Sequence, residues 1–153
     1  MSRNTVAGLL AGIGLFFGAA LAAGTATADE AANTVKVYKS PTCGCCAAWV
    51  DHLIDNGFVV QVVEKTDVEP FKRHFRVPPQ LYSCHTAEID GYVVEGHVPA
   101  ADIRRMLAER PAIRGLAVPG MPEGSPGMET GRVDPYSVVS FDDNNQLGEY
   151  ARY

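Results

Sequence analysis

The sequence predicts an α/β domain in which helices flank a mixed central sheet, and three observations support this. A β-branched run is followed by a helix-like run and a second β-branched run, which is the pattern of a βαβ unit. A further helix-like segment, a β-hairpin pattern and a third helix-like segment come next. The rest of the chain is rich in Gly and Pro and ends in strand-like residues.

The βαβ unit occupies residues 35–64. Strand 35–39 precedes a helix that we expect over 46–56, because five apolar side chains recur at helical spacing on one face. These side chains are Cys46, Trp49, Val50, Leu53 and Ile54. Gly57 ends the helix, and residues 58–64 are β-branched and nearly continuous, which is typical of a buried parallel strand.

The middle of the chain predicts a short helix over 69–76, which a pair of prolines ends. Strands over 83–89 and 92–95 flank Asp90-Gly91, a two-residue hairpin turn. A helix over 100–110 follows. This order of elements is that of the thioredoxin-like fold, so we expect that fold, with the cysteine-rich turn opening its first helix.

The chain changes character after Pro111. Residues 115–131 are rich in Gly and Pro, and Pro-Gly-Met occurs twice there, at Met121 and Met128. Residues 136–141 alternate like a strand, and residues 147–150 are expected to pair back on them. We interpret this Gly/Pro/Met loop and its strands as an extension of the same domain.

The N-terminus has the pattern of a secretory signal peptide, predicted over residues 1–28. Residues 6–23 are apolar, and Ala26-Thr27-Ala28 is an A-x-A cleavage site. An uncleaved membrane anchor is the alternative, but the cleavage site and the short, small-residue apolar core favour removal. Cleavage after Ala28 would leave residues 29–153 as one exported domain that is not attached to a membrane. Export would place the cysteines in an oxidising compartment.

The charge of the chain excludes one class of partner. The formal net charge is −5, and the sequence contains no cluster of Lys and Arg. Nucleic acid is therefore not an expected partner, because phosphate binding requires clustered positive charge.

Three of the four cysteines, Cys43, Cys45 and Cys46, lie at the predicted strand-to-helix turn. Backbone N–H groups and the helix dipole at such a turn favour thiolates. In a thioredoxin-like fold the segment before the hairpin lies opposite this turn, so Cys84 is expected to face the other three. Four converging thiolates suit Cu(I), Zn(II) or an iron–sulfur cluster. Two structural disulfides, or one redox disulfide between Cys43 and Cys46, are the alternatives.

Other soft or basic side chains could join this site. A thioether is a good ligand for Cu(I) and a poor one for zinc, so Met121 and Met128 are candidate ligands, although both could instead pack on the core. His85 adjoins Cys84 and could bind or support the metal, or lie at the surface. For His97 we expect a local backbone contact.

Several motifs together resemble the periplasmic CopG-type copper-resistance proteins, long catalogued as a domain of unknown function. The motifs are Pro41-Thr42-Cys43-Gly44-Cys45-Cys46, Ser83-Cys84-His85-Thr86-Ala87, Glu95-Gly96-His97-Val98-Pro99, Val118-Pro119-Gly120-Met121-Pro122 and Gly124-Ser125-Pro126-Gly127-Met128. The resemblance implies a thioredoxin-like fold, and copper held by the cysteines at positions 43, 45, 46 and 84. It leaves open whether copper is stored, passed on or oxidised.

The sequence thus predicts a periplasmic protein for copper resistance that holds several bridged Cu(I) ions, with zinc as a weaker alternative occupant. Other copper-handling proteins of the periplasm are the expected partners. The main alternative is a thiol–disulfide oxidoreductase that uses Cys43 and Cys46. A copper oxidoreductase and a disulfide-stapled binding module are further alternatives.

Overall fold

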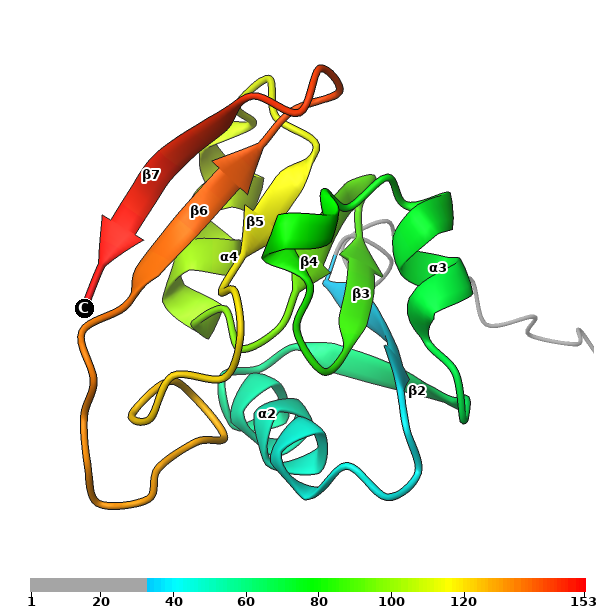
Figure 1. The fold of residues 1–153 in the computed structure, drawn as a ribbon, viewed down its shortest axis with the longest axis vertical. Coiled ribbons are helices and arrows are strands. Elements are labelled where there is room, and N and C mark those ends of the chain that lie inside the picture. Colours follow the sequence, from blue (N-terminus) through cyan, green and yellow to red (C-terminus); the bar gives the residue numbers. More distant parts are fainter. Residues whose placement is uncertain (1–32) are drawn as a thin grey trace, which may run out of the picture.

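A seven-stranded mixed sheet organises residues 33–153, the part of the chain that this computed structural model describes (Figure 1). The strands are β1 (Thr34–Lys39), β2 (Val59–Glu64), β3 (Thr86–Ile89), β4 (Tyr92–Glu95), β5 (Gly115–Ala117), β6 (Ser137–Phe141) and β7 (Leu147–Arg152). The helices are α2 (Gly44–Asp55), α3 (Glu69–His74) and α4 (Ala100–Glu109), with a 3₁₀ turn, η1, at Pro79–Leu81. The predicted signal peptide lies outside the described residues.

The strands follow the order β2-β1-β3-β4-β5-β6-β7. β1 and β2 are parallel and are joined through α2, whereas β3 pairs antiparallel with β1 and with β4. β5 runs parallel to β4, and the β6–β7 hairpin extends the sheet beyond it. The α/β prediction with a mixed sheet and a strand extension is confirmed, and the first four strands are compatible with the thioredoxin-like order.

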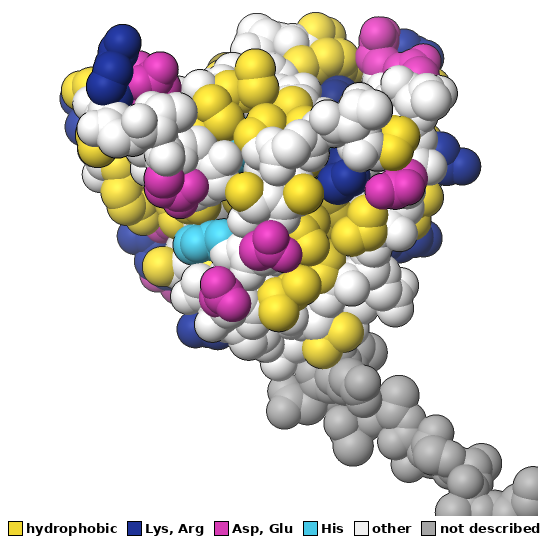
Figure 2. All heavy atoms as spheres, turned by 90° about the horizontal axis from the view of Figure 1, so that it is seen from below, with side chains coloured by type: hydrophobic (Ala, Val, Ile, Leu, Met, Phe, Trp, Pro, Cys, Tyr) yellow, Lys and Arg dark blue, Asp and Glu magenta, His cyan; other side chains and the backbone are white. Residues whose placement is uncertain are grey.

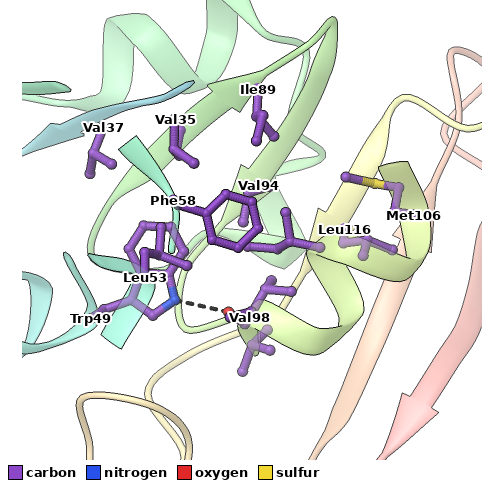
Figure 3. Packing of buried hydrophobic residues seen from close by; sticks show 14 of the residues in the cluster. Val35, Val37, Trp49, Leu53, Phe58, Ile89, Val94, Val98, Met106 and Leu116 are labelled. Atoms are coloured by element: carbon purple, nitrogen blue, oxygen red, sulfur yellow. Dashed lines mark hydrogen bonds between the residues drawn. The ribbon is translucent and has the colours of Figure 1, made fainter. Parts of the chain in front are cut away.

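Apolar side chains pack on both faces of the sheet because neighbouring residues of a strand point to opposite sides. Val94 of β4 joins the larger core with Trp49 and Leu53 of α2 and Met106 of α4 (Figure 3). Val93, its neighbour, joins a smaller cluster under η1. The sheet is therefore covered by α2 and α4 on one side and partly by the α3–η1 segment on the other.

Two predictions from local pattern were wrong. β2 is an edge strand, and Val59 and Val62 are 44% and 43% exposed, because no strand pairs with its outer side. Ile54 is 52% exposed, although it was placed on the buried face of α2. Strand β5 is an addition to the predicted elements, because its three residues lie in the stretch that the sequence predicts as a Gly/Pro-rich loop. None of the helices within residues 33–153 is long and apolar enough to cross a bilayer.

The N-terminus of α4 is capped from another helix. Pro99 precedes α4 and offers no side-chain cap, but the Ala100 N–H donates to Nε2 of His52 at 3.1 Å. Burial lowers the pKa of His52, although Glu129 and Asp55 oppose this shift. The imidazole is therefore held neutral, as its role as an acceptor requires, and it ties α4 to the helix that carries the cysteines.

The loop between β5 and β6 docks onto the first turns of α2, beside which it runs in Figure 1. Gly127 has a φ of +83°, and a Cβ atom there would lie 2.7 Å from both the Cys45 carbonyl oxygen and the Trp49 nitrogen. Ser125 and Pro126 are buried beside it. Only a residue without a side chain permits so close an approach of the loop to the cysteine-bearing helix.

Replacing Gly127 with Ala should therefore destabilise the protein more than the same change at Gly131. Gly131 also has a positive φ, +91°, but a Cβ atom there meets nothing within 4 Å. Backbone strain alone should cost about 1–2 kcal/mol in either variant, and overpacking against α2 should add about 1–3 kcal/mol in Gly127→Ala. Urea unfolding of both variants measures the difference. Equal losses would show that the loop does not depend on this contact.

Candidate metal centre

The four cysteine sulfurs converge at the start of α2 and lie within 4.8 Å of one another. Cys43 is the N-cap residue of α2, and Cys45 and Cys46 lie in its first turn. Cys84 comes from the loop before β3, across from that turn. The convergence that the fold order predicted is therefore present, and Cys46 is fully buried while the other three are half-buried.

Two of the four cysteines are oxidised to a disulfide, and two are free thiols. Cys43 and Cys46 form a disulfide with a Cα–Cα distance of 5.3 Å, whereas Cys45 and Cys84 are free. The Cys45 sulfur lies 3.5 Å from that of Cys43 and 3.9 Å from that of Cys84. Of the alternatives left open by the sequence, the C-x-x-C disulfide is present, and a second disulfide is not present among the described residues.

The burial of Cys84 changes the acidity of its thiol. Burial, followed by the proximity of Cys45, raises the pKa of Cys84 to about 12. Its thiol therefore carries a proton at neutral pH in the metal-free protein, and a bound cation would have to displace that proton.

Two buried histidines also face Cys84. Nε2 of His97 lies 3.1 Å, and Nδ1 of His85 3.4 Å, from the Cys84 sulfur. Both rings are fully buried, and burial lowers the pKa of each, so both are neutral. His97 does make a backbone contact, as expected, but with the remote Pro126 carbonyl at 2.8 Å and not with a local group. Its contact with Cys84 was missed.

A buried ion pair holds the Cys84 loop in place. The Glu95 carboxylate is fully buried, pairs with the buried ammonium of Lys72, and accepts the Ser83 N–H at 2.6 Å. Gly96 has a φ of +69°, and a Cβ atom there would lie 2.5 Å from Oγ of Ser83. Both contacts fix the residue that precedes Cys84, so the position of its sulfur is set from β4.

The structure gives weaker evidence for the two methionines at the metal site than for the four cysteines. Met121 is 52% exposed, and Met128 is half-buried directly after Gly127, the residue that contacts the Cys45 carbonyl. No hydrogen bond joins either thioether to the cysteines within residues 33–153. Their role as ligands remains a prediction.

The fold and site can now be compared with known proteins. A family model described as "Protein of unknown function, DUF411" matches residues 81–128, which include Cys84, both histidines and both Pro-Gly-Met units. No curated protein matches the chain.

Two solved structures are similar over most of the molecule. Both are of copper resistance protein CopG, in Form 1 and Form 2, and each is 47% identical in sequence with a TM-score of 0.75. The alignment covers 78% of this chain, and 97% of the Form 2 chain and 96% of the Form 1 chain. At this identity and coverage, the chain belongs to the CopG family of copper resistance proteins.

Proposed function

We propose that this protein protects cells from copper by binding Cu(I) through Cys43, Cys45, Cys46 and Cys84. The observation that carries the proposal is the convergence of the four sulfurs within 4.8 Å. Thiolates are soft ligands that select Cu(I), and they bridge metal ions readily. The names of the similar solved structures point to the same metal.

The donor set favours a multinuclear site. Cu(I) is satisfied by two or three ligands, so four sulfurs in one cluster exceed the need of a single ion and can bridge several. The Cys43–Cys46 disulfide removes two of these sulfurs. Its reduction by two electrons and two protons, supplied by a dithiol, would therefore be required before the full site can load.

The setting of this function is the periplasm. We retain the proposal that residues 1–28 are a signal peptide removed after Ala28, and that residues 29–153 form one domain. Other copper-handling proteins would deliver or accept the metal. Acidic side chains lie among apolar ones, together with Lys and Arg, on the face seen from the end at which α2 and the loop lie (Figure 2).

Protein with all four thiols reduced should bind more than one Cu(I) per chain. Cys84→Ser should lower the stoichiometry because it removes the sulfur that faces the α2 cysteines. Copper analysis after anaerobic desalting, with a Cu(I) chelator as competitor, measures both. The matched control is the same protein with the Cys43–Cys46 disulfide closed, which should retain less Cu(I). A single bound ion in the reduced protein, or preference for zinc in competition, would contradict the cluster.

We further propose that the loop carrying Met121 and Met128 covers the site, as an outer ligand set or as an apolar lid. The docking of Gly127 on α2 and the half-buried position of Met128 support this. Leu has nearly the volume and apolarity of Met but lacks the sulfur.

Replacing both methionines with Leu therefore separates these two roles. If a thioether ligates, the Cu(I) dissociation constant should rise by about tenfold, which corresponds to about 1.4 kcal/mol, with little loss of stability. If the loop is only a lid, the affinity should stay normal, and deletion of the loop should speed air oxidation. The single variants show which methionine acts, and Met128→Leu should have the larger effect. If copper affinity, copper release and air oxidation all stay unchanged, neither methionine belongs to the site.

A thiol–disulfide oxidoreductase is the second candidate, and the closed Cys43–Cys46 disulfide favours it. In such an enzyme this disulfide would accept two electrons and two protons from a substrate dithiol, which would itself become a disulfide. Cys45 argues against a clean cycle, because its thiol lies 3.5 Å from the Cys43 sulfur and can compete for it.

Insulin reduction by the metal-free protein distinguishes these functions. A copper-binding protein should give no turnover above that of the reductant alone. Turnover that persists in the presence of a copper chelator and is lost in Cys46→Ser would instead establish the oxidoreductase.

A further inference from the structure

Closing the Cys43–Cys46 disulfide does not leave the site without metal ligands. Two cysteines are then lost as ligands, but Cys84 stays free and faces His85 and His97. The three donor atoms, one sulfur and two ring nitrogens, lie within 4.8 Å of one another. This set shares only Cys84 with the four-cysteine cluster.

His97 is oriented as metal-binding histidines usually are. Its Nδ1–H donates to the Pro126 carbonyl at 2.8 Å, which fixes the tautomer and leaves a lone pair on Nε2. Nε2 points at the Cys84 sulfur, 3.1 Å away. A backbone carbonyl that holds one nitrogen while the other faces a thiol is the arrangement that raises ligand basicity and fixes ring direction.

His85 provides an independent second observation. Its ring is fully buried against Trp49, with ring centroids 4.4 Å apart, and its Nε2 has no hydrogen-bond partner among the described residues. A buried ring nitrogen without a partner is uncommon in folded proteins, so the position of this imidazole calls for an explanation. Nδ1, the other ring nitrogen, lies 3.4 Å from the Cys84 sulfur, so a cation bound between the two would be ligated by Nδ1.

We propose that Cys84, His85 and His97 form a second metal site, which binds one divalent ion, Cu(II) or Zn(II), while the Cys43–Cys46 disulfide is closed. Two imidazoles and one thiolate suit both ions.

The sharing of Cys84 makes the two donor sets alternatives. Opening the disulfide would restore the α2 thiolates, and Cys84 could then bridge Cu(I) ions with them. The state of the Cys43–Cys46 pair would therefore select between a nitrogen-rich site for one divalent ion and a sulfur-rich site for Cu(I). The nitrogen-rich site does not require the Cu(I) cluster to exist, so it can be tested by itself.

Co(II) is the probe of choice, because it substitutes for divalent ions in such sites, and its visible bands and thiolate charge-transfer band report the ligands. The mature chain with its disulfide closed should bind one Co(II) and show a thiolate-to-cobalt band. His97→Gln should weaken binding at least tenfold. His74→Gln is the matched control, since His74 is exposed on α3, and it should bind as the unaltered chain does.

Two further measurements make the result decisive. Cys45→Ser should keep the cobalt spectrum, because Cys45 does not belong to this donor set. In the unaltered chain, the NMR spectrum should show exchangeable ring N–H signals of two histidines shifted by the bound cobalt. This measurement does not depend on the folding of any variant. No Co(II) binding at millimolar concentration, or binding that survives His97→Gln and is lost in Cys45→Ser, would overturn the proposal. Copper counting on the reduced chain tests the Cu(I) cluster separately.

Discussion

The burial of Trp49 is the interaction on which the rest of the site depends. Its indole N–H donates to the Val98 carbonyl at 2.9 Å, which holds the segment that carries His97 (Figure 3). Its ring packs on His85, and its backbone nitrogen meets Gly127 of the Pro-Gly-Met loop. One fully buried side chain on the cysteine helix thus holds the segment that carries His97 and packs on the ring of His85, and the backbone of the same residue lies against the Pro-Gly-Met loop.

The buried ion pair near the sulfurs is unfavourable for folding, but it helps to position the site. Taking Lys72 and Glu95 out of water is expensive, and a buried ion pair is weak grounds for expecting stability. The pair instead provides a fixed acceptor for the Ser83 N–H, next to Cys84. The ion pair therefore costs some folding free energy, and it fixes the position of Cys84, the one cysteine that lies away from the start of α2 in the sequence.

Cys84 is the residue at which the possible chemistries meet. Its sulfur lies 3.9 Å from the Cys45 sulfur and 3.1 Å from Nε2 of His97. The half-buried thiol of Cys84 is protonated at neutral pH. It must lose this proton before it can act as a metal ligand or as a nucleophile. Under the two proposals made above, Cys84 would ligate Cu(I) together with the other cysteines when the Cys43–Cys46 disulfide is open, or a divalent ion together with the two histidines when it is closed.

Local sequence alone determined the elements with strong periodicity, and with them the place of three cysteines. The βαβ pattern, the Asp90-Gly91 hairpin and the turn at Cys43 depend on neighbours along the chain, and the element order then predicted that Cys84 would lie opposite. Only the tertiary structure decided that β2 is an exposed edge, that Gly127 docks on α2 and that His97 reaches Cys84. These features depend on which strands pair and how closely backbones approach, and a run of valines or a lone histidine looks the same in sequence whichever neighbours it meets in space.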